Sequence, residues 1–285
     1  VRAGLVLVAF GAVARHLGPE NYGLLSYATA FAGLFVPLAV LGLDYVVVME
    51  LVRNREGERR VLATTAGLKI GGAVLALLAA GGALLLVSAD NPARGLLPVV
   101  LLSLGLQPCL IFDSWFQSRI ASRDSVFARL AASVGANGAR LVLVAADAPL
   151  VWFAWVFAIE AGLYGLGLGL VFRRAGGPSL AAWWRDFDRQ LAGRLWRQAW
   201  PLFLADLAIV GYLKLDQLLL SQLEGPERRG RYAAAYRLAE AGEFLMLALI
   251  NSQFPRFVAA HAQEGMFSAV IGRFMRQMIW LAIGV

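Results

Sequence analysis

Long apolar runs separated by short polar connectors occupy most of the chain. An α-helix rises about 1.5 Å per residue, so about 20 apolar residues match the roughly 30 Å hydrocarbon core of a bilayer. Runs of this order lie at residues 22–43, 62–87, 95–112, 126–146, 150–172, 198–220 and 232–255. The pattern therefore predicts an all-α, multi-pass integral membrane protein.

Two shorter apolar runs lie at the ends, at residues 1–14 and 274–285. At about 1.5 Å per residue, each run falls short of the hydrocarbon thickness. The first run has no charged segment before it and no cleavage context after it, so it does not resemble a signal peptide. We expect the sequence to be a fragment of a longer membrane protein.

The composition agrees with a membrane protein and excludes several other classes. Hydrophobic residues make up 59% of the chain and charged residues 16%, whereas soluble domains carry about 45–50% and 25%. A disordered chain and an ordinary soluble enzyme are therefore not expected. One cysteine and two distant histidines argue against a disulfide framework, a multi-cysteine metal site and a zinc site.

The net charge of +7 arises mostly from arginines between the apolar runs, which indicates membrane topology rather than nucleic-acid binding. The connectors and flanking turns at 53–60, 113–124, 173–197 and 256–273 hold fourteen arginines, and the opposite connectors hold five. The positive-inside rule places the arginine-rich set in the cytoplasm. The longest connector, 173–197, is expected to lie on the cytoplasmic face with Trp183 and Trp184 at headgroup level; a plain solvated linker is the alternative.

An internal repeat suggests two lobes. Gly18-Pro19-Glu20, with Gly23, recurs as Gly225-Pro226-Glu227, with Gly230, 207 residues later. Six spans separate the two copies, so both would have the same orientation in the membrane. The prediction is a six-helix lobe at 1–172 with a truncated first helix, a cytoplasmic linker at 173–197, and a partial second lobe at 198–285. The second lobe would hold the runs 198–220 and 232–255 and the start of another.

One expected helix carries a polar stripe. Arg129, Ser133, Asn137 and Arg140 stand at offsets 0, 4, 8 and 11 in the run 126–146, so they share one helix face. Guanidinium groups bind phosphate in a bidentate manner, which makes this stripe a candidate anion site in a cavity. The alternative is that each arginine reaches for the nearer membrane interface.

Further charges lie within later runs. Asp206, Lys214 and Asp216 are in the run 198–220; Lys214 and Asp216 point about 160° apart, so their partners must lie on other helices or in the cavity. Arg237 and Glu240 have the i, i+3 spacing of a helical ion pair. These charges are candidates for coupling to an ion or a proton, and structural ion pairs are the alternative.

Pro37 should kink the helix predicted at 22–43, which suits a gate, although many membrane helices carry a proline that has no gating role. Lys69 and Glu160 are single charges in other runs. No nucleophile elbow, Walker loop or metal-ligand spacing occurs. We therefore expect no catalytic residues, no cofactor and no enzymatic activity.

The chain resembles the oligosaccharide flippases of polysaccharide biosynthesis, which are relatives of MATE exporters and lipid II flippases in the MOP superfamily. The resemblance runs over almost the whole chain and rests on a set of blocks: Ala14-Arg15-His16-Leu17-Gly18-Pro19-Glu20, Tyr22-Gly23, Ser26-Tyr27-Ala28, Leu41-Gly42-Leu43-Asp44, Glu50-Leu51-Val52-Arg53, Phe112-Asp113-Ser114-Trp115-Phe116-Gln117, Trp200-Pro201-Leu202, Tyr212-Leu213-Lys214-Leu215-Asp216-Gln217, Gly230-Arg231-Tyr232, Ala234-Ala235, Arg237-Leu238 with Glu240, and Phe254-Pro255.

The resemblance implies a MATE-like transporter of the bacterial cytoplasmic (inner) membrane, with two lobes around a cationic cavity. It would translocate an undecaprenyl-diphosphate-linked oligosaccharide, such as an O-antigen, capsule or exopolysaccharide unit, by alternating access. A polysaccharide polymerase and chain-length machinery would be partners, besides membrane lipids. Arg129, Asn137, Arg140 and Lys214 would hold the diphosphate; the family usually has arginine at Lys214.

Two other functions stay open. A cation-coupled multidrug exporter of the MATE type should prefer an acidic cavity to a basic one. A membrane glycosyltransferase or polymerase for the same lipid carrier would require a long outer loop, and the connectors are short.

Overall fold

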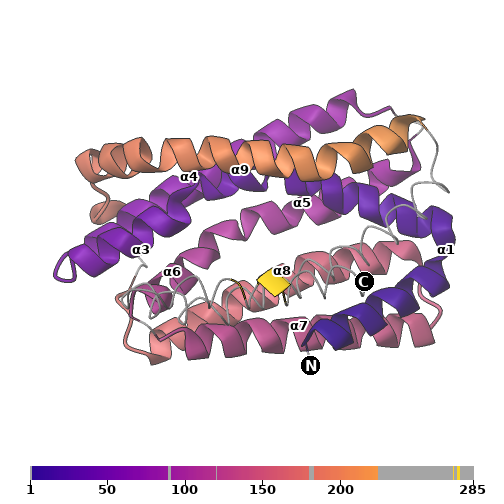
Figure 1. Ribbon diagram of the computed structural model, residues 1–285, viewed down its shortest axis with the longest axis horizontal. Helices are drawn as coiled ribbons and strands as arrows, with labels where there is room; N and C mark the ends of the chain where they lie inside the picture. The colour runs from indigo at the N-terminus through magenta and orange to yellow at the C-terminus, as the bar shows by residue number, and fades with distance from the viewer. Residues whose placement is uncertain are drawn as a thin grey trace. The chain divides into compact units, whose positions relative to one another are not determined.

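The computed structural model describes residues 2–88, 91–119, 121–179, 183–223, 272 and 275–276. The chain groups into two compact units, Val1–Arg231 and Tyr232–Val285, and all the elements named below belong to the first. They are α1 (Arg2–Leu34), α2 (Val36–Val40), α3 (Leu43–Arg53), α4 (Glu58–Leu86), η1 (Pro92–Gly95), α5 (Leu97–Gly105), η2 (Gln107–Leu110), α6 (Ile111–Ser118), α7 (Ser122–Ala145), α8 (Leu150–Arg174), η3 (Trp183–Arg185) and α9 (Arg189–Leu223) (Figure 1). No strand occurs in the described ranges.

The prediction of an all-α integral membrane protein is confirmed. Five helical segments in the described part of the chain are long and apolar enough to cross a membrane: Val8–Arg53, Glu58–Leu86, Leu97–Ser118, Arg123–Ala145 and Leu150–Arg174. They correspond to the predicted runs from 22–43 to 150–172. The run 198–220 lies inside α9, which is not among these five, and the runs 232–255 and 274–285 lie outside the described residues.

The polar sequence between the first two runs is a break inside α1 rather than an open loop. Gly18 has φ 70° and ψ 171°, outside the helical region. Only glycine adopts this backbone conformation readily, because it has no Cβ. Pro19 then starts a new helical segment, for which its fixed φ is suited. Figure 1 shows two arms of α1 meeting at an angle.

The predicted kink at Pro37 is present. The chain leaves the helical pattern at Phe35, and Pro37 lies near the N-terminus of the short helix α2, where its missing N–H is tolerated. A second break follows at Leu41 and Gly42, which have φ values of 57° and 63°. The predicted helix 22–43 is therefore three helices, and its last part continues to Arg53.

Two predicted connectors are shorter than expected. The connector 113–124 contains α6 as far as Ser118, because the run 95–112 continues through Trp115 and Phe116, which are both buried. The connector 173–197 becomes helical at Arg189, since Asp188 caps α9: the backbone N–H groups of Gln190 and Leu191 lie 2.8 and 3.2 Å from its Oδ1.

Alternate connectors meet at the same end of the first unit. At one end Arg59 pairs with Asp186 at 2.8 Å, and Arg119 pairs with Glu58 at 2.5 Å. At the other end the His16 Nε2 lies 3.1 Å from the carbonyl oxygen of Ala148. This alternation agrees with the predicted up-and-down order. The side of the membrane that each end faces stays a prediction, as does the division into lobes at 1–172, 173–197 and 198–285.

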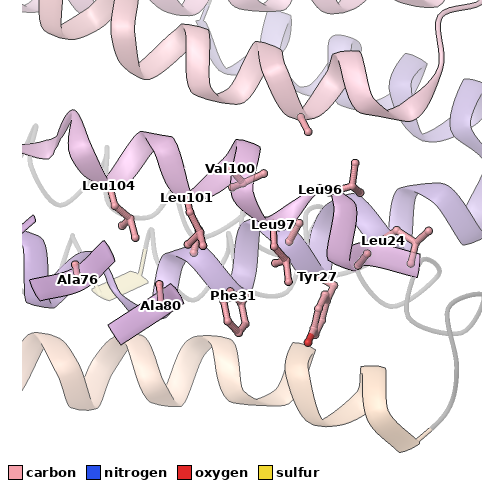
Figure 2. Packing of buried hydrophobic residues seen from close by; sticks show 14 of the residues in the cluster. Leu24, Tyr27, Phe31, Ala76, Ala80, Leu96, Leu97, Val100, Leu101 and Leu104 are labelled. Carbon is pink, nitrogen blue, oxygen red and sulfur yellow. The ribbon is translucent and has the colours of Figure 1, made fainter. Parts of the chain in front are cut away.

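The core divides into two clusters along the helices. The first joins α1, α4 and α5, where the small residues Ala76 and Ala80 of α4 lie among Phe31, Leu97 and Leu101 (Figure 2). The second joins α3, α4, α6 and α9. Because lipid tails are as apolar as leucine, such helices associate mainly by close van der Waals packing, which small residues allow.

Candidate functional site

A cavity of about 420 Å³ lies between α1, α5, α7 and α8 in the first unit. Its polar lining residues come from all four helices and from η2. They are Thr29, Ser103, Gln107, Arg129, Glu160 and Tyr164. The remaining lining is apolar, mostly small residues and one aromatic ring: Ala32, Gly33, Val36, Ala132, Phe157 and Ala161.

Arg129 presents a half-exposed guanidinium group to this cavity. Its Nη2 lies 3.0 Å from Asp113 Oδ2 of α6, and it donates hydrogen bonds of 2.7 and 3.0 Å to the Tyr164 hydroxyl of α8. The guanidinium also lies over the Tyr164 ring, 5.1 Å from its centroid. A carboxylate, a hydroxyl and an aromatic face thus hold Arg129 in one orientation.

Arg140 is the buried arginine of the predicted stripe. Its side chain is 9% exposed and its Nη2 lies 2.7 Å from Glu160 Oε2. Its Nη1 donates to Asn137 Oδ1 at 3.1 Å, and the guanidinium lies 5.3 Å from the centroid of the Phe10 ring. Glu160 lines the cavity and Arg140 does not. Arg140 is therefore connected to the cavity through its ion pair with Glu160.

Asn137 links the stripe together. Its Nδ2 donates to the backbone oxygen of Ser133 at 2.7 Å, while its Oδ1 accepts from Arg140. Asn137 and Ser133 are both buried and neither lines the cavity. The shared helix face is therefore confirmed, and Arg129 is its one cavity-lining arginine among the described residues.

The carboxylate partners of the two arginines were not predicted. The observed partners are Asp113 of α6 and Glu160 of α8. The short connection at 146–149 makes α7 and α8 an antiparallel hairpin, and this could have indicated that α8 supplies partners for the arginines of α7. In such a hairpin, residues similarly distant from the turn come together, as Arg129 does with Tyr164.

The remaining predicted positions lie around α9. Lys214 packs next to the cavity-lining residue Gly33, since its Cε is 4.0 Å from the place of a Gly33 Cβ. Asp206 is exposed on α9 and experiences the charge of Asp44. The backbone of Asp216 is helical and its side chain lies outside the described part; Arg237 and Glu240 lie wholly outside it. Pro37 is buried in α2.

A further ion pair that was not predicted joins a buried lysine to a half-exposed carboxylate. Lys69 of α4, whose side chain is 1% exposed, pairs with Asp44 of α3. Its neighbourhood includes Gly42, where a Cβ would lie 2.5 Å from the backbone nitrogen of Phe203. The chain at Gly42, just before α3, therefore lies too close to the α9 backbone for any side chain at this position.

Gln107 is a cavity residue that the hydrophobic pattern gave no reason to select. It lies in η2, the short turn after α5, and lines the cavity. Its amide has no hydrogen-bond partner within the residues that the structure describes. An amide and a guanidinium in the lining of one cavity can bind hydroxyl groups and anionic oxygens, which is recognition rather than catalysis.

Groups of three or more acidic, histidine or cysteine side chains that could hold a metal ion are absent from the described ranges. No curated protein and no solved structure matches the chain. The family model with the description "Polysaccharide biosynthesis protein" matches residues 1–261. The described part of the chain has five helices long and apolar enough to cross a membrane, which makes it a multi-pass membrane protein. Because the match covers most of the chain, the protein belongs to the polysaccharide biosynthesis protein family.

Proposed function

We propose that the protein is a flippase, not an enzyme, that moves an undecaprenyl-diphosphate-linked oligosaccharide across the bacterial cytoplasmic membrane by alternating access of two MATE-like lobes. The observation that carries this proposal is the polar cavity among membrane-spanning helices, with Arg129 and Gln107 on its wall. Such a cavity solvates sugar hydroxyls and a diphosphate, which hydrocarbon cannot do. Family membership supports the biosynthetic role.

In this mechanism the arginines attract the diphosphate and carry out no covalent step. Arg129 is half exposed and can offer donors to an anion while it keeps its bond to Tyr164. Arg140 can do so only if Glu160 releases it. Lys214, next to Gly33, adds a further cation close to the cavity.

The proposal is tested in cells whose own copy of the gene carries the substitution. Arg129→Ala and Lys214→Ala should abolish export of surface polysaccharide at unchanged protein level, and Arg140→Lys should restore only part of the function lost in Arg140→Ala, because ammonium lacks the bidentate fork. Arg94→Ala, in the connector η1, is the matched control and should export normally. Normal polysaccharide in Arg129→Ala, Arg140→Ala and Lys214→Ala alike would contradict the proposal.

A charge swap separates an anion site from a structural ion pair. Arg140→Glu combined with Glu160→Arg keeps an ion pair between α7 and α8 but moves the cation. Wild-type export by a stable swap variant would assign Arg140 a structural role alone. Loss of export at normal protein level would support direct use of the guanidinium.

A cation-coupled exporter is the second candidate, and Glu160 in the cavity wall is the observation that favours it. Such a protein should protect cells from cationic drugs, and Glu160→Gln should remove this protection. Drug resistance with normal surface polysaccharide in a gene deletion would favour the exporter over the flippase.

A further inference from the structure

A second hollow lies on the opposite side of α8 from the polar cavity. It is an open groove of about 740 Å³ between α8 and the segment from Leu106 to Phe112, which contains η2 and the start of α6. Its floor is formed by Gly162, Gly165 and Gly169, and its apolar wall includes Leu106 and Phe112. These glycines recur every three or four residues and therefore follow one face of the helix.

The groove is present because the floor has no side chains. A Cβ on Gly162 or Gly169 would lie 3.7 or 3.6 Å from Leu106 and Phe112, which is ordinary contact distance. A Cβ on Gly165 would lie 3.0 Å from the Cβ of Cys109, which is too close without a shift. The helices therefore meet tightly at Gly165, while larger side chains at the other two positions would fill the groove.

One end of the groove is polar and closed by the chain itself. Arg173 lines this end, together with Gly177, Pro178 and Ser179. The backbone N–H of Gly177 donates to the carbonyl oxygen of Phe172 at 3.0 Å, which folds the chain back over the end of α8. A Cβ on Gly177 would lie 2.5 Å from the Phe172 ring, so any larger residue there would displace that ring.

We propose that this groove binds an anionic phospholipid, with one acyl chain along the glycines and its phosphate at Arg173. The groove runs from Gly162 to Arg173, about 16 Å along the helix at 1.5 Å per residue. That length matches one leaflet, half of the roughly 30 Å hydrocarbon core. The apolar floor and the arginine at one end are complementary to a lipid that carries a negative headgroup.

The proposal is tested with the purified full chain by native mass spectrometry, in detergent with equal amounts of phosphatidylglycerol and phosphatidylcholine. The wild type should retain phosphatidylglycerol preferentially. Arg173→Ala should reduce that preference about fivefold, the effect of one basic residue near an anionic lipid. Arg174→Ala is the matched control, because the adjacent arginine does not line the groove, and it should retain the preference.

A variant that fills the groove tests its location. Gly162→Leu should abolish retention of both lipids, because its side chain would extend past the Cβ position that already contacts Leu106, and an unchanged circular dichroism spectrum and melting temperature would show that the fold is kept. Gly138→Leu is the control, because Gly138 is an exposed glycine of α7 with open space around it. Equal retention of the two lipids by the wild type, or unchanged retention in Gly162→Leu, would overturn the proposal.

The chain's single cysteine supplies a reporter within the groove. Cys109 lines it, so phosphatidylglycerol in nanodiscs should slow its alkylation by N-ethylmaleimide relative to phosphatidylcholine, and Arg173→Ala should remove the difference. Protection by a polyisoprenyl phosphate in preference to phosphatidylglycerol would replace the proposed occupant with the isoprenoid carrier. Equal alkylation rates in every lipid would mean that the groove holds no specific lipid.

Discussion

One face of α8 carries Glu160 and Tyr164 toward the polar cavity, and the opposite face carries Gly162 and Gly169 along the apolar groove. On the first face, space is kept by charged side chains whose partners hold them in place. On the second, space is kept by the absence of side chains. The two faces of one helix therefore depend on different physical effects, which separate substitutions can distinguish.

The polar face is costly to change at one position alone. Removing one partner of a buried ion pair leaves the other charge without compensation, whereas replacing both partners with apolar groups is often nearly neutral. The glycine face has no such coupling, and its substitutions act through the space that they fill and through helix propensity. Breaking the ion pair between Arg140 and Glu160 should therefore have a larger effect than a substitution on the glycine face.

Glu160→Gln should have the largest effect. It leaves the Arg140 guanidinium, 9% exposed, without its carboxylate, and we expect a loss of about 3 kcal/mol, the lower end for a buried pair since Glu160 is partly exposed. Thermal unfolding in detergent, followed by tryptophan fluorescence, measures the loss. The double variant Glu160→Gln with Arg140→Met should regain most of it. A single variant as stable as the wild type would show that the pair is not buried in the folded protein.

Gly165→Ala should destabilise by about 1–3 kcal/mol, because its Cβ would lie 3.0 Å from the Cβ of Cys109. Gly162→Ala and Gly169→Ala are the matched controls, and each should be neutral or should stabilise the helix by about 0.5–1 kcal/mol. Thermal unfolding by tryptophan fluorescence compares the three variants. The same effect at all three positions would contradict the close approach at Gly165.

Tyr164→Phe should have the smallest effect on stability, about 0.5–1 kcal/mol, because it removes hydrogen bonds to a half-exposed arginine and keeps the ring beneath it. Under the proposed function, its effect on polysaccharide export should exceed its effect on stability, since Arg129 loses the group that orients it. Export measured at matched protein level checks this. A stability loss as large as that of Glu160→Gln would remove the distinction between the exposed and the buried arginine.

The helical periodicity of the sequence correctly placed Arg129, Ser133, Asn137 and Arg140 on one face, because side-chain direction along a helix is a local property. It could not identify Asp113 and Glu160 as their partners. Those contacts depend on how α6 and α8 pack against α7, at separations of 16 and 20 residues. The roles of the more distant candidates Lys214, Asp206 and Pro37 stay predictions.

The boundaries of the elements likewise depend partly on local hydropathy and partly on packing between helices. Hydropathy located five membrane-spanning segments but missed the continuation through Trp115 and Phe116, whose burial is decided by neighbouring helices.

The sequence by itself determined the fold class and the polar stripe on α7, because the first follows from composition and hydropathy and the second from periodicity within one helix. Only the tertiary structure decided which guanidinium faces the cavity, which carboxylates neutralise the stripe, and that the glycines line a groove ending at Arg173. The physical reason is that ion pairs and cavities are made between helices, where packing distances and not sequence spacing decide what meets.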